Sequence, residues 1–315
     1  LGAVLLIGGV IVVIAAPQVG GSKNPDDLQP IYGAGGVVGL TGLILAIVYA
    51  VKYNKANKRF VREFKNTIVD PIVKFVNPSL EYNMDSFIPQ TEFSKSRIFE
   101  PGDKEAQRRN WFSSGSKSVY YKGEDHVKGM IGATDVQFSE LNYYYEVKRR
   151  GSDGKTKTEK KTIFKGVFFI ADFHKNFTKD VVVLPDTSER MFGSLGKMFQ
   201  KMNFQRDKVV RLEDPRFEKE FVVYSNDEVE SRYILTPAMM ERMTEYKKKV
   251  GQKMYFSFVD SRLFMAIRYR KDLFEPTIMK SINDFGLVQE FFENMKVFVD
   301  MVEDLDLNTR IWTKE

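Results

Sequence analysis

Two long apolar stretches at the N-terminus constrain this chain more than any other feature of its sequence. Residues 1–16 carry no charged side chain, and after a polar loop a second uncharged stretch covers residues 31–51. A helix that crosses a bilayer needs about 20 mostly apolar residues, which the second stretch supplies. The first is shorter, and because the chain opens on Leu1 rather than Met, we infer that further residues precede it. We therefore predict a transmembrane helical hairpin over residues 1–51.

A signal peptide followed by a single anchor helix is the alternative reading of this region. A cleavable signal needs small side chains just before the cleavage point. The bulky Ile14 stands at one of those positions in the stretch that ends at Ala16. The sequence therefore favours the hairpin over the cleaved signal.

A basic segment follows the second apolar stretch and sets the predicted orientation. Its cations are Lys52, Lys55, Lys58, Arg59, Arg62 and Lys65, with Glu63 as the one acidic neighbour. Lys and Arg concentrate on the cytoplasmic side of membrane-spanning helices. We therefore expect a bacterial inner-membrane protein whose large C-terminal part lies in the cytoplasm. We read residues 52–77 as a basic juxtamembrane amphipathic helix, in which the first five of these cations contact anionic lipid.

Small residues recur on one face of the second apolar stretch. Gly35, Gly39, Gly42 and Ala46 share that face, and small side chains let membrane helices approach closely. The stripe packs either the two helices of one hairpin or two subunits of a homo-oligomer. We keep both readings and expect an oligomer.

Residues 78–315 are predicted to form the α+β domain, with a mostly antiparallel sheet and flanking helices. If this part holds two subdomains, the division falls near 187–207. The pattern predicts a strand at 165–172 paired with one at 181–184, and a second pair from 208–212 and 217–224. It also predicts a helix capped by Thr236, a hairpin turning at 260–261, and a C-terminal amphipathic helix over 287–305.

A basic stretch between two predicted strands reads as an exposed hairpin tip. It runs from Arg149 to Lys161 and holds two glycines. A solvated turn is the simplest interpretation of such a stretch. Contact with anionic lipid is the alternative, and it would use Arg149, Arg150, Lys155 and Lys157.

No motif in the sequence points to a chemistry. The chain has no Cys and two His residues, His126 and His174, so a Cys/His metal site cannot be built. Metalloprotease, phosphate-loop and nucleophile-elbow motifs are missing. The net charge of +6 comes without a basic face carrying stacking aromatic residues, which argues against nucleic-acid binding. We expect no catalytic, cofactor or metal residues.

Three sequence blocks resemble a known family. FKGVFFIADFHKNF with VVVLPD spans 164–186, FEKEFVVYSNDEVESRYILTPAMMERM spans 217–243, and YFSFVDSRLFMAIRY with LFEP spans 255–276. Together they are similar to the bacterial membrane family catalogued as domain of unknown function 3137. The resemblance implies two N-terminal spans followed by a soluble domain, and a LemA-type membrane protein as a partner. It implies no activity, cofactor or site residue.

These expectations combine into one functional hypothesis. The chain is expected to be a membrane-anchored interaction or scaffold domain in a bacterial inner-membrane complex, without catalysis. One alternative is a domain that binds or senses anionic lipid. The other is an unrecognised enzyme, which a deep polar pocket with convergent ionisable groups would favour.

Overall fold

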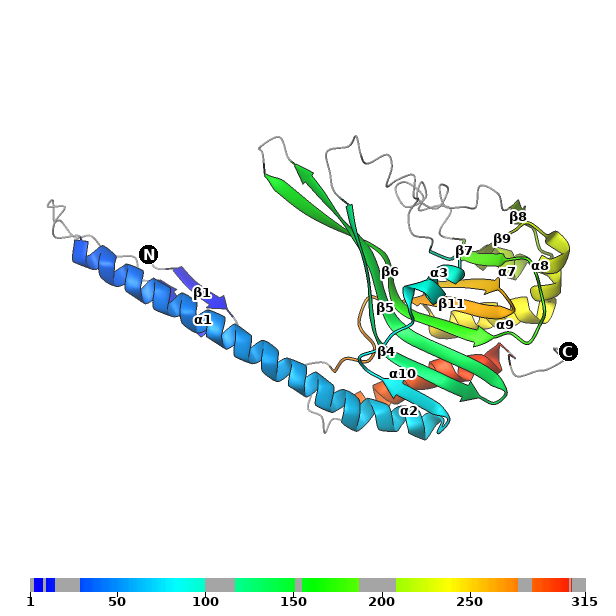
Figure 1. Ribbon diagram of the computed structural model, residues 1–315, viewed down its shortest axis with the longest axis horizontal. Coiled ribbons are helices and arrows are strands. Elements are labelled where there is room, and N and C mark those ends of the chain that lie inside the picture. The colour runs from blue at the N-terminus through cyan, green and yellow to red at the C-terminus, as the bar shows by residue number, and fades with distance from the viewer. Residues whose placement is uncertain are drawn as a thin grey trace. The chain divides into compact units, whose positions relative to one another are not determined.

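Figure 1 shows the computed structural model of the chain. The structure describes residues 3–7, 10–14, 29–99, 117–150, 155–186, 208–276, 285–305 and 307. The chain divides into two compact units, one containing Leu1–Phe64 and the other Lys65–Glu275 and the C-terminal helix. Each unit is described by itself below.

The first apolar stretch forms strands, so the predicted transmembrane hairpin is wrong. β1 (Ala3–Ile7) pairs antiparallel with β2 (Val10–Ile14), with Ala3 opposite Ile14. All five residues of β2 are β-branched, and such side chains favour the extended backbone. The same composition that made the stretch look like a membrane helix therefore suits a strand.

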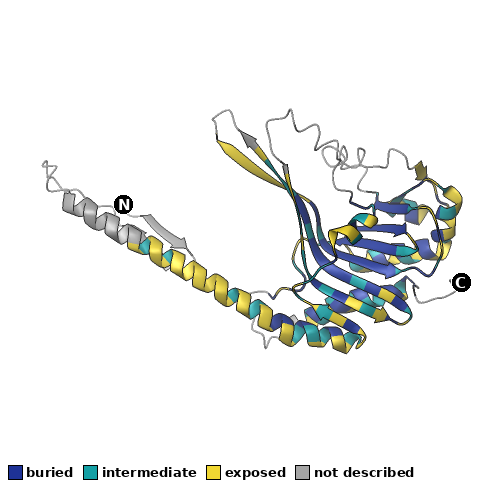
Figure 2. Cartoon of the chain, viewed as in Figure 1, coloured by how far each residue is buried: buried dark blue, intermediate teal, exposed yellow. Residues whose placement is uncertain are grey.

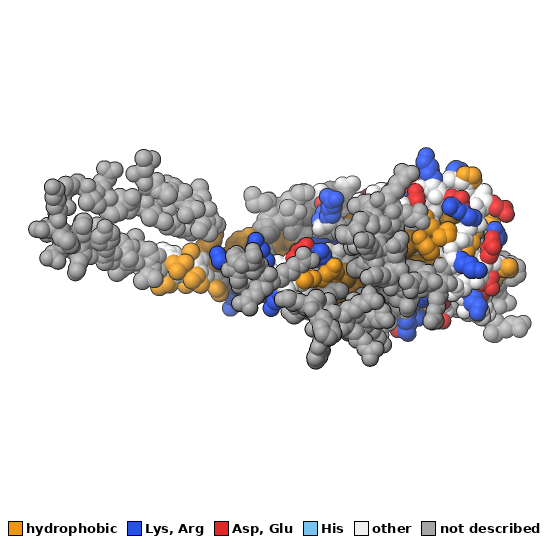
Figure 3. All heavy atoms as spheres, turned by 90° about the horizontal axis from the view of Figure 1, so that it is seen from above, with side chains coloured by type: hydrophobic (Ala, Val, Ile, Leu, Met, Phe, Trp, Pro, Cys, Tyr) orange, Lys and Arg blue, Asp and Glu red, His pale blue; other side chains and the backbone are white. Residues whose placement is uncertain are grey.

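The second apolar stretch lies in the long helix α1 (Gln29–Phe64). Among the helices that the structure describes, none is both long enough and apolar enough to cross a membrane. The apolar side chains of Leu43–Val51 are exposed except for the half-buried Ala46, and exposed basic ones follow along the helix, as Figure 3 shows. A π-helical turn (Lys65–Val69) and α2 (Asp70–Val76) come next in the chain, and the juxtamembrane role expected for 52–77 stays a prediction.

Nine strands form one sheet in the second unit, in the order β3-β4-β5-β6-β11-β10-β7-β9-β8. Every pairing between these strands is antiparallel, which confirms the expected mostly antiparallel sheet. The strands are β3 (Leu80–Asn83), β4 (Lys117–Ile131), β5 (Thr134–Arg150), β6 (Thr156–Asp172), β7 (Val181–Pro185), β8 (Lys208–Val210), β9 (Phe221–Ser225), β10 (Met254–Val259) and β11 (Arg262–Arg268). The other helices in the part of the chain that the structure describes are α3 (Gln90–Lys95), α7 (Pro215–Glu220), α8 (Glu228–Ile234), α9 (Pro237–Val250) and α10 (Phe285–Asp304).

One predicted pairing differs from the observed order, whereas the pair expected from 208–212 and 217–224 is present as β8 with β9. β7 does not pair with β6, because the hairpin of β10 and β11 lies between them. Residues 217–220 belong to α7 rather than to a strand, since the Asp214 side chain caps a helix that begins at Pro215. Strands β7 and β9 pair directly, so the residues on both sides of 187–207 share one sheet. The segment 187–207 itself lies outside the described residues.

Other local predictions are confirmed. The Thr236 hydroxyl accepts a hydrogen bond from the Met239 amide at 3.3 Å and caps α9, with Pro237 in its first turn. β10 and β11 form the expected hairpin, and Asp260 and Ser261 both have positive φ, as a tight hairpin turn of this hand requires. α10 begins at Phe285, close to the predicted start.

The sheet is covered on both faces in its central part. One face carries an aromatic cluster in which Phe93 of α3 contacts Phe168, with ring centroids 4.8 Å apart. On the other face Phe298 of α10 packs on Phe138 of β5, and the Tyr246 hydroxyl of α9 donates to the Val297 carbonyl. Figure 2 shows the resulting buried centre of the sheet. Helices α9 and α10 on one side and α3 on the other form the layers that position the pockets below.

The paired strands β5 and β6 extend beyond this core as an arm. Their register runs out to Arg150 opposite Thr156, which confirms that the basic stretch joins two paired strands. Residues 155–160 are exposed, whereas Ile163–Ala171 are almost all buried, and Figure 2 shows this change along β6. Residues 151–154 lie outside the described residues. The arm carries Lys155 and Lys157, two of the predicted lipid-contact residues.

Candidate functional site

A β-bulge in β4 brings two adjacent acidic side chains toward the same place. The register between β4 and β5 shifts between Glu124 and Val127, and Asp125 has a φ of 59°. Along a regular strand, neighbouring side chains point to opposite faces, and a bulge breaks this alternation. The Asp125 amide donates a hydrogen bond to the Met84 carbonyl at 3.2 Å. Glu124 and Asp125 can therefore share one cation.

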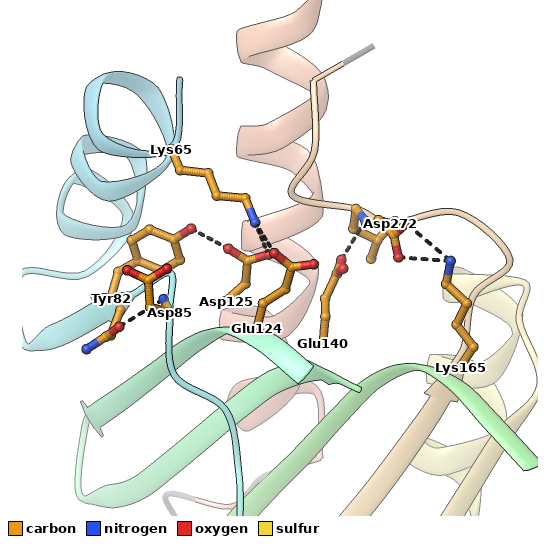
Figure 4. A network of polar contacts seen from close by, with 10 residues as sticks. Lys65, Tyr82, Asp85, Glu124, Asp125, Glu140, Lys165 and Asp272 are labelled. Atoms are coloured by element: carbon orange, nitrogen blue, oxygen red, sulfur yellow. Dashed lines mark hydrogen bonds and ion pairs between the residues drawn. The ribbon is translucent and has the colours of Figure 1, made fainter. Parts of the chain in front are cut away.

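That cation is the ammonium of Lys65, from the π-helical turn. Its Nζ lies 2.6 Å from Glu124 Oε2 and 2.7 Å from Asp125 Oδ2. The side chains of Lys65 and Asp125 are 3% and 0% exposed, so water contributes almost nothing to their solvation. The Tyr82 hydroxyl of β3 donates a further hydrogen bond to Asp125, as Figure 4 shows. Buried charges are tolerated only when they are paired in this way.

Glu140 of β5 supplies a third carboxyl group to the cluster. One carboxyl oxygen from each of Glu124, Asp125 and Glu140 lies within 4.8 Å of the other two. Glu140 is buried and accepts a hydrogen bond from the Leu273 amide at 2.5 Å. In Figure 4 the three acidic side chains point into the same space, from β4 and β5. Lys65 forms ion pairs with the first two, and no ion pair to Glu140 is present among the described residues.

The environment separates the proton affinities of these acids. Burial raises the pKa of Asp125 to about 6, although Lys65 and Tyr82 oppose the rise. Burial together with the charge of Asp125 raises the pKa of Glu140 to about 8. Burial alone would lower the pKa of Lys65, but the two carboxylates outweigh it, and the pKa is raised. Near neutral pH, Glu140 therefore holds a proton while Lys65 is charged.

A cavity of about 460 Å³ opens beside Glu124 and Glu140. We call it the acidic pocket. Its polar lining residues are Asp85, Lys122, Glu124, Glu140, Asn142, Lys165, Lys271 and Asp272. Lys165 pairs with Asp272 at 3.0 Å, and Lys271 pairs with Glu290 at 2.6 Å, so two of the three lysines are already neutralised. The oxygen of the Asn142 side chain is buried without a hydrogen-bond partner. The pocket is thus rich in acceptors.

Three carboxyl groups at this spacing are the oxygen ligands that Mg²⁺ or Ca²⁺ would use. The Lys65 ammonium already contacts two of them, and it supplies the positive charge that a metal ion would otherwise bring. A metal would have to displace it. The arrangement therefore favours recognition of positive charge or of hydrogen-bond donors at the pocket wall, next to Glu140.

The predicted site residues lie elsewhere. Lys52, Lys55, Lys58, Arg59 and Arg62 are exposed along α1, and Arg59 pairs with Glu63 at 3.0 Å. Arg149 and Arg150 end β5, and their side chains lie outside the described residues. In the small-residue stripe, a Cβ added to Gly42 would meet nothing within 4 Å. The structure does not describe the surroundings of Gly35 and Gly39, so the packing role of the stripe stays a prediction.

Sequence analysis missed Lys65, Glu124, Asp125 and Glu140 as a site. Lys65 reads as the last cation of a basic helix, and the three acids come from strands whose pairing the sequence does not give. The sequence did contain one signal of the site, because Glu140 lies between Phe138 and Asn142 on one strand face. An acid within an otherwise buried strand is costly, and it therefore indicates a partner or a function.

Comparison with known proteins gives one match. Residues 162–307 match the model of a family described as a protein of unknown function (DUF3137). This segment starts within β6 and includes the three blocks whose resemblance was noted. The strands that carry Glu124 and Glu140 precede it in the chain. No curated protein and no solved structure matches the chain.

Proposed function

We propose that this protein is a non-catalytic binding domain of a bacterial inner-membrane complex, and that its acidic pocket takes a small ligand carrying an ammonium group. The acidic pocket carries the proposal. Pockets of about 300–1,000 Å³ with a few placed polar groups are the usual size for small ligands. Glu140 and Asn142 provide acceptors on its wall, and their neighbours Glu124 and Asp272 add negative charge.

The bonding within the cluster supports binding rather than catalysis. Lys65 is engaged by two carboxylates, Tyr82 donates to Asp125, and Glu140 accepts from the Leu273 amide. A general base or nucleophile must instead be able to reach the substrate. Groups that are held by one another can shape a pocket and give it charge without taking part in a reaction.

Exposed cations support a place at a membrane surface. Five basic residues between Lys52 and Arg62 are exposed on α1, and each cation near an anionic bilayer contributes on the order of 1 kcal/mol. Lys155 and Lys157 on the arm are also exposed. Anionic-lipid contact through these segments, a homo-oligomer and a LemA-type partner stay predictions.

One observation favours an enzyme as the second candidate. Two acids near each other, Asp125 with a pKa of about 6 and Glu140 with a pKa of about 8, resemble a pair in which one group gives a proton and the other takes it. Turnover of an ammonium-bearing substrate that is lost in Glu140→Gln would replace the binding proposal by this one.

The ligand proposal is tested by calorimetric titration of the full chain with putrescine, a small diammonium compound, at pH 7 and low salt. We expect saturable binding that weakens at least about tenfold in Glu140→Gln, because an ammonium group beside Glu140 favours its ionised form, which Gln cannot adopt. The matched control is Glu81→Gln, whose side chain is 75% exposed and lies outside the pocket. Absence of saturable binding, or equal weakening in both variants, would refute the proposal.

A further inference from the structure

A second cavity of about 620 Å³ lies at the ends of the central strands, within the second unit. We call it the cationic pocket. It is lined by Thr162, Lys165, Gly251, Gln252, Lys253, Arg268, Tyr269 and Arg270. Four of these eight residues are cations, and no acidic residue is among them. All eight lie within the segment that matches the family model.

Backbone contacts hold the three segments of this pocket together. The Arg268 amide donates to the Lys253 carbonyl at 3.0 Å, and the Tyr269 amide donates to the Lys165 carbonyl at 3.1 Å. These bonds fasten the end of β11 to the start of β10 on one side and to β6 on the other. The cations are therefore carried by a rigid sheet end rather than by a long loop, which favours a preformed site.

The charges of the pocket are only partly neutralised. Lys165 pairs with Asp272 at 3.0 Å. Among the described residues, Arg268 and Arg270 form no ion pair, and the Arg268 guanidinium donates to the Ile163 carbonyl while its Nε has no partner. Like charges held together without a counter-ion repel one another. An anion in the cavity would relieve that repulsion and would gain charge-assisted hydrogen bonds.

The donors of the pocket suit a phosphate group. Arg presents its N–H groups in a planar fork that matches phosphate oxygens, and Lys adds point charge. Thr162 and Tyr269 bring hydroxyl groups, and burial raises the pKa of Tyr269 to about 12, so that hydroxyl keeps its proton. Near Gly251, which ends α9 with a φ of 67°, an added Cβ would meet nothing within 4 Å. This open space provides an approach to the cations.

The size of the cavity indicates what the phosphate is attached to. A volume of about 620 Å³ is that of a site for an organic ligand, and it is much more than a bare phosphate ion fills. One effect opposes anion binding, because the carboxyl end of α9 carries about half a negative charge near Gly251. Full charges on Lys253, Arg268 and Arg270 outweigh it.

We propose that the cationic pocket binds the phosphate-monoester group of an organic molecule. The group can belong to a soluble metabolite or to a lipid headgroup, since both present the same oxyanion. Arg268 and Arg270 contact the phosphate oxygens, Lys253 adds charge at the mouth, and Thr162 and Tyr269 donate hydrogen bonds. Apart from Lys165, which lines both cavities, this site is distinct from the acidic pocket, and it does not depend on the function proposed for that pocket.

Two ligand sources distinguish the soluble and membrane forms of the proposal. The full chain is titrated with glycerol 3-phosphate, with glycerol as the uncharged control. In parallel, its binding to phosphatidylcholine vesicles with and without phosphatidic acid is measured by flotation. Phosphatidic acid carries the same monoester as glycerol 3-phosphate. Binding of the soluble compound assigns the site to a metabolite, and binding confined to the vesicles with phosphatidic acid assigns it to a lipid.

The variant Lys253→Gln/Arg270→Gln tests the pocket in either case. Both side chains are exposed, so the fold should tolerate their loss. The control Lys179→Gln/Arg211→Gln removes the same charge from exposed residues outside the pocket. We expect the pocket variant to bind at least about tenfold more weakly, and the control to stay within about twofold of the wild type. Wild-type protein that binds neither source, or two variants that behave alike, would overturn the proposal.

Discussion

The acidic pocket and the cationic pocket meet at one side chain, Lys165, which lines both. Glu140, which lines the acidic pocket, and Asp125, which lies next to the lining residue Glu124, are buried and depend on internal partners. In the cationic pocket the charges come from strand ends, where Lys253 and Arg270 are exposed. The comparison shows that one sheet carries buried charged groups beside one pocket and exposed charged groups in the other. Buried charges are coupled to folding, whereas exposed charges are available to a ligand.

The largest expected effect is on the acidic side and depends on pH. The pKa of Glu140 is raised from 4.5 to about 8, so the folded state binds more protons than the unfolded state between these values. The stabilisation due to the neutral group is fully present below pH 4.5 and is lost as the pH rises through 8. In Glu140→Gln this loss should disappear. Relative to the wild type, the variant should gain on the order of 5 kcal/mol in free energy of unfolding by pH 9.

Urea unfolding at pH 5, 7 and 9 measures this difference. The exposed Glu81→Gln serves again as control, and its difference from wild type should not change with pH. If Glu140→Gln and wild type lose stability in parallel up to pH 9, then Glu140 is solvated and the contrast in depth between the two pockets fails.

The next effect concerns the buried pair of Lys65 and Asp125. Lys65→Met leaves a buried carboxylate without its cation, and Asp125→Asn removes the fully buried carboxylate partner of a buried ammonium. Each should lower the free energy of unfolding by about 3–5 kcal/mol at pH 7. The double variant should lose much less than the sum, because Glu124 is 41% exposed and can be solvated by water.

A double-mutant cycle on an exposed pair sets the scale for this result. Lys74 and Asp70 lie 2.8 Å apart in α2, with side chains 60% and 30% exposed. Their coupling should be no more than about 0.5 kcal/mol. Equal coupling in the two cycles would show that the Lys65 pair behaves as a surface pair.

The smallest effect is expected on the cationic side. Lys253→Gln/Arg270→Gln should change the free energy of unfolding by no more than about 0.5 kcal/mol, as surface substitutions usually do. Urea unfolding at pH 7 checks this, with Lys179→Gln/Arg211→Gln alongside. A large loss of stability would mean that these cations help to hold the strand ends. The charges of the cationic pocket would then be coupled to folding, as those near the acidic pocket are.

The sequence predicted local structure well where neighbouring residues decide it. The cap at Thr236, the hairpin turn at Asp260 and the arm between β5 and β6 each follow from a few adjacent residues. Strand order did not follow, because β7 pairs with β10 and β9 through contacts far apart in the chain. The apolar stretch at Val10–Ile14 was misread because apolar β-branched residues suit both a membrane helix and a strand.

The sites were out of reach for a related reason. Lys65 lies 59 residues before Glu124 in the chain, and Glu124 and Asp125 point to the same place only because of a bulge that no residue pattern indicates. The cationic pocket likewise gathers Thr162, Lys253 and Arg270 from three segments. None of these residues stands out from the 29% of the chain that is charged or from its polar remainder.

The exposed arm of β5 and β6 has a consequence for the dynamics of the domain. Beyond Val147, the described residues of β5 and β6 pair only with each other, and Lys157 in this part of the ribbon is exposed. Without buried apolar area, the opening of these pairs takes little free energy, so their amide hydrogens exchange with solvent by local fraying. From Ile163 onward the strand is buried, and exchange there requires cooperative opening of the sheet. The arm can therefore fray and re-form while both pockets keep their shape.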